Sequence, residues 1–167
     1  RKLECGMSTL EVKAIQAPSG FDLDMPAGHI VQVVSATYST EASSTSTTPA
    51  DTGLTATITP KFASSKIVVV VSQALGEQRN DQYHQANLLL LRGTTVLQTI
   101  IRRINYPSSS NTFTSETQAI NYLDSPNTTS ATTYKTQFKC GAGSNSDSAT
   151  VNHLSSNASI TLMEVAG

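Results

Sequence analysis

The stretch KIVVVVSQAL at residues 66–75, together with ANLLLLR at residues 86–92, decides the fold class of this 167-residue chain. β-Branched side chains favour strands because they pack well on a pleated surface. Continuous apolar runs that end at turn-forming residues are typical of strands covered on both faces. Four consecutive leucines are also compatible with a helix, but no helix-capping pattern precedes them and Gly93 follows directly. We therefore predict two buried strands, with a hairpin turn at residues 92–95 that leads into a strand at residues 96–104.

Other segments show the apolar, period-two pattern that is typical of half-buried strands. We predict such strands at residues 10–14, 29–37, 54–59, 113–123, 132–138, 149–154 and 159–165. Residue types that favour turns are concentrated in the connections at residues 45–53, 105–111, 124–130 and 141–148. About eight or nine short strands without a long helical segment predict an all-β fold, an antiparallel β-sandwich or jelly roll.

The first 28 residues differ from the rest, and we interpret them as an N-terminal stalk ahead of a head domain at residues 29–167. Leu10, Val12 and Ile15 are the apolar residues of a short segment in this stalk. An isolated strand or hairpin is only marginally stable in water, so the segment cannot bury these residues by itself. We therefore expect the three side chains to pack against a partner chain.

Composition excludes several classes of protein. Hydrophobic residues make up 38% of the chain, and the apolar runs need a core, which argues against disorder. The net charge of -1 provides no positive field for nucleic acid, so nucleic acid is not an expected partner. No apolar run approaches the roughly 20 residues of a membrane helix, and we expect no membrane insertion. Cys5 and Cys140 lie near opposite ends of the chain and predict no disulfide framework.

No pattern typical of a catalytic or metal site occurs in the sequence. The three histidines are scattered, so a metal site would need the tertiary fold to bring them together. Asp22 and Asp24 offer oxygen atoms to calcium, but a solvated turn is the simpler interpretation. Glycoside cleavage needs two cooperating carboxylates, and nothing marks a facing pair among Glu77, Asp81, Glu116 and Asp124. We therefore predict a protein that is not an enzyme and that has no catalytic residue, metal or cofactor.

The densest polar segment, GEQRNDQYHQ at residues 76–85, lies between the two most apolar strands. A solvent-facing loop here would present together the side chains of Arg79, Asp81, Tyr83 and His84. Mixed planar and charged groups suit the recognition of sugars or peptides. An ordinary hydrophilic loop is the alternative interpretation.

Adjacent arginines, Arg102 and Arg103, stand on the strand predicted after the hairpin. Successive side chains of a strand point to opposite faces, so only one of the two can belong to a given surface. We expect one of them to pair with a carboxylate within or between subunits.

Several segments resemble a widespread family of bacteriophage tail fibres, which includes fibres of phages that infect cyanobacteria and other aquatic bacteria. The segments are GHIVQVV (28–34), DTGLTATITP (51–60), SSKIVVV (64–70), YLDSP (122–126), TSATTYKTQ (129–137) and SITLMEVA (159–166). In addition, MSTLEVKAIQ at residues 7–16 resembles the start of such fibres, so we expect residues 1–6 to be additions to the natural chain.

The resemblance implies a homotrimer in the virion, with jelly-roll heads similar to those of tumour necrosis factor and complement C1q. It also implies that the N-terminal strands interlock, which gives Leu10, Val12 and Ile15 a role in trimerisation. The likeness covers the scaffold and leaves out residues 76–85, 105–116 and 141–148. A rigid scaffold with loops of free composition is a usual way to present a binding site. We therefore expect receptor contact in these segments, at Arg79, Asp81, Tyr83, His84, Tyr106, Asn111, Asn145 and Asp147.

Three functions follow from this interpretation. The first is attachment of the virion to a glycan or protein on the bacterial surface, with weak contacts multiplied by threefold valency. The alternative is a purely structural virion protein, a capsid decoration or fibre-shaft module that contacts only other virion proteins. A depolymerase that cuts host polysaccharide would need a carboxylate pair in a groove between subunits.

Overall fold

The structure is a computed structural model, and it describes residues 26–79, 83–105, 112–141 and 148–167. Leu10, Val12 and Ile15 lie outside the described residues, and their role in trimerisation stays a prediction. Within the described ranges the chain forms strands β1 (Ile30–Tyr38), β2 (Ala42–Ser44), β3 (Ala50–Ile58), β4 (Lys66–Arg79), β5 (Tyr83–Arg92), β6 (Thr95–Asn105), β7 (Thr112–Asp124), β8 (Thr132–Cys140), β9 (Ser148–Val151) and β10 (Ala158–Val165), with one 3-10 turn, η1 (His153–Ser155).

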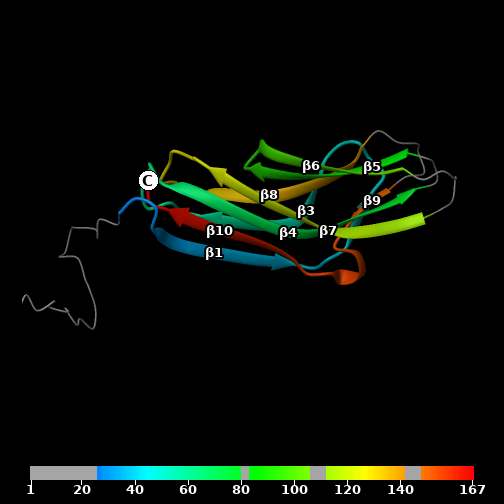
Figure 1. Ribbon diagram of the computed structural model, residues 1–167, viewed down its shortest axis with the longest axis horizontal. Helices are drawn as coiled ribbons and strands as arrows, with labels where there is room; N and C mark the ends of the chain where they lie inside the picture. The colour runs from blue at the N-terminus through cyan, green and yellow to red at the C-terminus, as the bar shows by residue number, and fades with distance from the viewer. Residues whose placement is uncertain (1–25, 80–82, 106–111, 142–147) are drawn as a thin grey trace, which may run out of the picture.

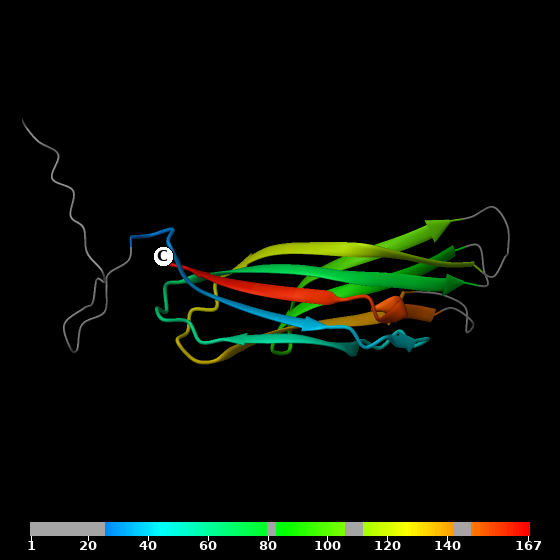
Figure 2. The ribbon, with the colours of Figure 1, turned by 90° about the horizontal axis from the view of Figure 1, so that it is seen from below.

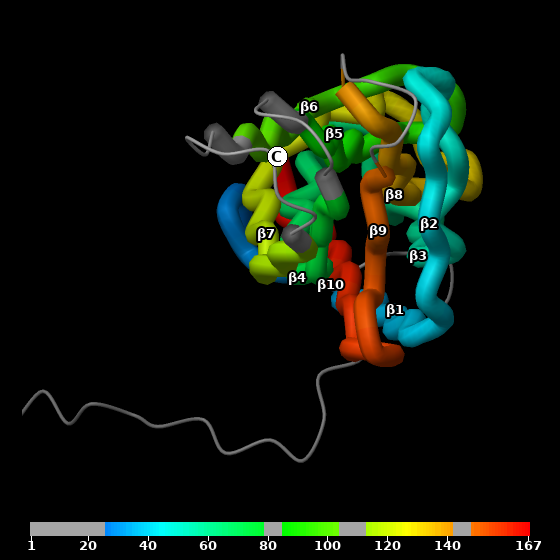
Figure 3. The backbone as a smooth tube through the Cα atoms, turned by 90° about the vertical axis from the view of Figure 1, so that its right-hand side faces the viewer, coloured from blue at the N-terminus to red at the C-terminus, as the bar shows by residue number. Residues whose placement is uncertain are grey.

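The strands form two antiparallel sheets that pack face to face (Figure 1). In sheet A, β10 lies between β1 and β4, and β7 pairs with the other edge of β4. Strand β9 continues along β4 beyond β10, and the short β2 pairs with β9 at the margin of the sheet (Figure 3). Sheet B has the order β3-β8-β5-β6. The first and last described strands are thus neighbours, a crossing pattern typical of a jelly roll. The predicted all-β antiparallel sandwich is confirmed.

The core lies between the sheets and is built from the inward side of each alternating strand. Strand β8 alternates buried and half-buried residues along its whole length, as does β10. From sheet A, Ile67 and Leu162 are fully buried, and they face Leu88 and Tyr134, which are fully buried from sheet B. This alternation is the physical reason why the period-two pattern located most strands correctly.

The two apolar runs of the sequence differ in how they are covered. The leucine run on β5 is buried on both faces: Leu89 and Leu91 point outward yet are only 6% and 4% exposed. Their register neighbours are Gln137 and Lys135 on β8, and Thr99 and Val96 on β6. On β4, by contrast, the outward Val68 and Val70 are only half-buried. The prediction of cover on both faces is confirmed for the leucine run and is wrong for the valine run within one chain.

Other predictions were wrong at the ends of strands. Strand β4 extends four residues beyond the apolar run, to Arg79, and β5 begins at Tyr83, so the described part of the predicted loop at residues 76–85 is strand. Strand β9 ends at Val151, and Leu154, which we predicted to be in a strand, lies in η1 with a φ of 55° and an exposure of 83%. The three-residue β2 gave no pattern long enough to detect. The hairpin is correct, since β5 ends at Arg92 and β6 begins at Thr95.

A chain of polar side chains crosses the otherwise apolar core and joins the two sheets. The hydroxyl of Thr136 on β8 donates to Oε1 of Gln73 on β4 at 2.8 Å, and it lies 2.6 Å from the hydroxyl of Thr52 on β3. The amide of Gln73 donates to Oδ1 of Asn152 at 3.1 Å, and Asn152 donates to the carbonyl of Thr40 at 3.0 Å. Each of these buried groups has a partner, as a low-dielectric interior requires.

We predict that Thr136→Val lowers the free energy of unfolding by about 1–3 kcal/mol, because it leaves the buried Oε1 of Gln73 without the hydrogen bond from Thr136. Urea unfolding monitored by circular dichroism measures the change. The matched control is Thr133→Val on the outer side of the same strand, where the hydroxyl pairs with Thr57 at an exposed position. It should change stability by about 0.5 kcal/mol or less. Equal losses in both variants would contradict a structural role for the buried chain.

Candidate binding surfaces

The three polar segments that the resemblance leaves out are all attached at one end of the sandwich, which we call the far end. Strand β4 ends beside the start of β7, where Arg79 pairs with Thr112. Strand β5 starts beside the end of β6, where Tyr83 pairs with Asn105. Strand β9 starts beside the same end of β4. The strands that flank residues 80–82, 106–111 and 142–147 thus end together (Figure 2).

The predicted receptor-binding residues are only partly described. The backbones of Arg79, Tyr83 and His84 lie at the far end, on β4 and β5 rather than on a loop. The side chains of these three residues are outside the description, as are all atoms of Asp81, Tyr106, Asn111, Asn145 and Asp147. The structure therefore brings the strand ends beside these residues together, and the contacts of their side chains stay predictions.

The chain enters the sandwich at the opposite end, the near end. The backbone N–H of Gly28 donates to the carbonyl of Ala166 at 2.8 Å, and the N–H of Ala166 donates to His29 at 2.8 Å. Residue 26 and the last residue, Gly167, thus lie at the near end (Figure 1). A segment that precedes residue 26 is attached at the end away from the three polar connections.

An ion pair beneath the far end joins the two sheets. The guanidinium of Arg102 on β6 donates to Oε1 of Glu77 on β4 at 2.5 Å and to the hydroxyl of Thr114 on β7 at 3.3 Å. The Arg102 and Glu77 side chains are 8% and 0% exposed, so both charges are withdrawn from water. Arg103, on the opposite face of β6, is exposed and donates to Gln85. The expected pairing of one of these arginines with a carboxylate is confirmed.

Two of the buried carboxylates, Glu77 and Asp124, are partners of arginine. Asp124 accepts two hydrogen bonds from Arg92, at 2.8 and 2.7 Å, and one from the hydroxyl of Tyr134 at 2.6 Å. Burial and the nearby Asp124 carboxylate raise the pKa of Tyr134 above its ordinary value. Asp124 pairs in register with Ile67 at the near end, ten positions before Glu77 on β4. At 3.3 Å per residue this separation is about 33 Å, far beyond the reach of a glycosidase pair.

The outer side of sheet A carries few charges, and we call it the uncharged face. One row across it consists of Val33 on β1, Met163 on β10, Val68 on β4 and Leu123 on β7, each in register with the next. Val33 and Leu123 are 57% and 55% exposed. The next row contains Ser35, Thr161, Val70 and Asn121. Among the described residues, Lys66 is the only ionised residue on the outward side of β4 between Lys66 and Gly76. The outward residues in register with this part of β4, on β10, β1 and β7, carry no charge.

The outer side of sheet B differs, because charged side chains stand among its exposed apolar residues, Val96 and Ile101. Asp51, Lys135, Lys139 and Arg103 stand on its outward positions. Charged and mixed side chains of both signs are typical of a surface that stays in water. The two outer faces of the same sandwich therefore differ in solvation, and only that of sheet A presents a row of large apolar groups without charges.

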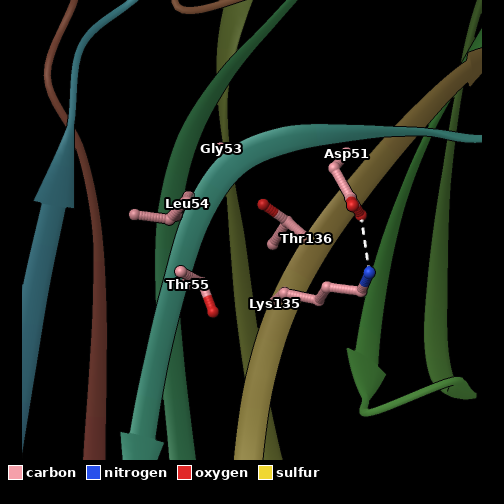
Figure 4. Close-up of a pocket in the computed structure, with 6 residues that line it drawn as sticks. All are labelled: Asp51, Gly53, Leu54, Thr55, Lys135 and Thr136. Carbon is pink, nitrogen blue, oxygen red and sulfur yellow. Dashed lines mark ion pairs between the residues drawn. The ribbon is translucent and has the colours of Figure 1, made fainter.

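A recess of about 240 Å³ opens on the outer side of sheet B, between β3 and β8 (Figure 4). Its cause is an irregular register: Asp51 pairs with Gln137, but the next paired position is Thr55 with Lys135. Three residues on β3 thus stand opposite one residue on β8, and the strands separate. The recess is lined by Asp51, Gly53, Leu54, Thr55, Lys135 and Thr136.

One side of the recess carries an ion pair. The Lys135 ammonium lies 2.8 Å from Oδ1 of Asp51, and the two side chains point toward one another in Figure 4. The amide of Gln137 donates to the same oxygen at 2.9 Å. The hydrogen bonds from Lys135 and Gln137 lower the pKa of Asp51, so its carboxylate stays ionised in neutral and mildly acidic solution.

Gly53 allows the separated part of β3 to lie close to β1. Its φ is 91°, a left-handed value that favours glycine, and a Cβ atom there would meet the ring of Tyr38 at 2.4 Å. The backbone N–H of Leu54 donates to the hydroxyl of Thr52, and that hydroxyl donates toward the carbonyl of Thr136 at 3.3 Å. Side-chain hydrogen bonds thus replace the missing ladder bonds, and the recess is a defined element of the fold.

No group of three or more His, Cys, Asp and Glu side chains could hold a metal ion in the described ranges. Within the same residues, no helix is long and apolar enough to cross a membrane.

Comparison with known proteins identifies no family. No family model and no curated protein match the sequence. Solved structures with a similar chain trace include the VP2 subviral particle of infectious bursal disease virus, with 13% identity and a TM-score of 0.40 over 93% of this chain. The T13 particle of the same virus gives 13% identity, 93% coverage and a TM-score of 0.39. The chain spans 42% and 40% of the length of these two proteins.

The uncharged face and the recess were not predicted from the sequence. A signal for the uncharged face was present, because the valine run has apolar residues on both sides of one strand. No local signal existed for the recess, since it depends on the register between β3 and β8, which are about 80 residues apart.

We predict that Arg102→Met destabilises the protein by about 3–5 kcal/mol, because it removes the guanidinium that pairs with the buried Glu77 carboxylate. Arg103→Met is the matched control, since it removes the same group one residue away from an exposed position. It should cost about 0.5 kcal/mol or less. Chemical unfolding of both variants measures the difference, and similar stabilities would contradict the importance of the far-end ion pair.

Proposed function

We propose that this chain forms the host-attachment head of a homotrimeric bacteriophage fibre and is a component of the virion. Three copies pack against one another through the uncharged face. The far end, with its three polar connections, contacts a glycan or a protein on the bacterial surface. The protein acts by binding, and the proposal includes no catalytic step.

The uncharged face supports the assembly. The sequence of β4 has the pattern of a strand covered on both sides, yet in one chain Val68 and Val70 are only half-buried. Exposed apolar surface costs free energy in water, and contiguous patches of it mark interaction sites. A second copy of this chain would cover the outward valines of β4. A face of small and apolar groups can pack against another protein surface without removing charges from water.

The observation that carries the attachment function is the orientation of the head, because residue 26 and the attachment points of the three polar connections stand at opposite ends of the sandwich. Residue 26 is at the near end, and the strands beside the three polar connections end at the far end. A stalk that precedes the head would therefore hold the far end outward. The connections lie in the segments that the resemblance to tail fibres leaves out, which supports their use in recognition.

Residues from segments that carry the resemblance meet at the near end. The amide of Gln32 on β1 donates to the carbonyl of Thr59 at 2.7 Å and to Oε2 of Glu164 on β10 at 2.6 Å. Burial raises the pKa of Glu164, but the hydrogen bonds from Gln32 and the backbone of Lys61 and Phe62 outweigh it and lower the pKa. The carboxylate stays ionised and joins three segments, which supports a shared scaffold.

A structural virion protein without receptor contact is the alternative. Under it, the far end would contact other virion proteins, and purified trimers would not adsorb to bacteria. A depolymerase gains no support from the buried carboxylates Glu77 and Asp124, because both are engaged by arginines.

The trimer predicts that mass photometry of the full chain gives three times the mass of one chain. Leu123→Asp should convert it to monomers, because a charge on the uncharged face would be desolvated in the assembly. Ile101→Asp is the control: Ile101 is 52% exposed, close to the 55% of Leu123, but it lies on β6, on the outer side of sheet B. A stable wild-type monomer, or an unchanged trimer in Leu123→Asp, would contradict the proposed interface.

Attachment predicts that fluorescently labelled trimers adsorb to at least one strain in a panel of aquatic bacteria that includes cyanobacteria. Replacing residues 106–111 by a Gly-Ser linker of equal length should reduce adsorption at least about tenfold, since all three copies lose the contact. The control replaces residues 127–129 at the near end. If trimers adsorb to no strain, or if the two replacements act alike, the attachment function is wrong.

A further inference from the structure

The recess on sheet B offers a second place where the head could hold a ligand, away from the far end. The recess exists because three residues of β3 stand opposite one residue of β8. The hydroxyl of Thr52 donates to the backbone carbonyl of Thr136 in place of a ladder hydrogen bond. Bulges of this kind often lie beside functional sites, where they shape a cavity in an otherwise closed sheet.

The chemistry of the rim narrows the class of ligand. The Asp51 carboxylate only accepts hydrogen bonds, and the Lys135 ammonium only donates them. The two lie 2.8 Å apart, and the Gln137 amide stands beside them. Their charges cancel, so the rim favours neither an anion nor a cation. Adjacent hydroxyl groups, each able to donate and accept, are the complementary partner.

The remaining lining is small and largely aliphatic. Gly53 presents backbone, Thr55 lies along the β3 side, and the Leu54 side chain points away from the ion pair in Figure 4. A volume of about 240 Å³ is below the roughly 300–1,000 Å³ of pockets for drug-sized ligands. The space therefore suits one ring with hydroxyls on one edge and a C–H face on the other side.

We propose that this recess binds one neutral sugar residue of a bacterial surface polysaccharide. Two neighbouring hydroxyls of the sugar donate to Asp51 and accept from Lys135 and Gln137, and its C–H face packs toward Gly53 and Thr55. The inference rests on the proposed attachment function, for which it names a ligand class. Because the recess lies on the opposite sheet from the uncharged face, it stays open in the trimer, and three weak sites act together.

Saturation-transfer NMR with the full chain tests the site. The probes are the methyl glycosides of glucose, galactose, mannose, N-acetylglucosamine and rhamnose at about 10 mM, a concentration that detects dissociation constants near about 1 mM. At least one glycoside should bind the wild type, and Asp51→Asn should weaken it at least tenfold. Asp51 has a side chain that is 58% exposed, so this isosteric change leaves the fold intact.

Lys135→Met and Lys139→Met form a matched pair on the same strand and the same outer face. The first should weaken glycoside binding at least fivefold, and the second should leave it unchanged, with circular dichroism confirming that both are folded. No binding of any probe, or equal binding by wild type and Asp51→Asn, overturns the sugar site. Adsorption to cells separates this inference from the proposed function. Adsorption without glycoside binding removes only the sugar site, whereas glycoside binding without adsorption removes only the attachment function.

Discussion

The need to cover both sides of β4 is the constraint on which the rest of the structure depends. Its inward residues fill the core against sheet B, and it pairs with β10, β9 and β7, so it organises all of sheet A. Its outward residues, Val68 and Val70, are apolar as well. A single chain buries the inward residues of β4 and leaves the outward valines partly exposed. The proposed trimer follows from this asymmetry, since each copy supplies the cover that the others lack.

Polar groups set the geometry where apolar packing alone would not. The hydrogen-bonded chain through Gln73 and Thr136 fixes how the sheets face each other at mid-length. The ion pairs of Glu77 with Arg102 and of Asp124 with Arg92 fix them near the two ends. Buried pairs of this kind contribute little net stability compared with apolar groups, but breaking one is costly. The far end is thereby held as a firm base for the connections that we propose to contact the host.

Most of the fold could be predicted from the sequence because strand alternation and turn residues are local signals. The hairpin at Gly93 followed from its turn residues. The opposite roles of Arg102 and Arg103 followed from the alternation of side chains along a strand. The extension of β4 through Glu77 could not be predicted, because that carboxylate is made compatible with burial by an arginine from another strand. The recess likewise depends on a register between distant strands. Of the predicted contact residues, the structure places three backbones at the far end, and the other five lie outside the described residues.

An experimental structure of the assembled protein, by electron cryomicroscopy or crystallography, tests the central claim most directly. The account predicts three copies around one axis, with Val33 and Leu123, 57% and 55% exposed in the single chain, buried between copies. The charged outer side of sheet B, with Asp51 and Lys135, should face the solvent. An assembly in which the uncharged face is open to water, or in which copies meet through sheet B, would contradict it.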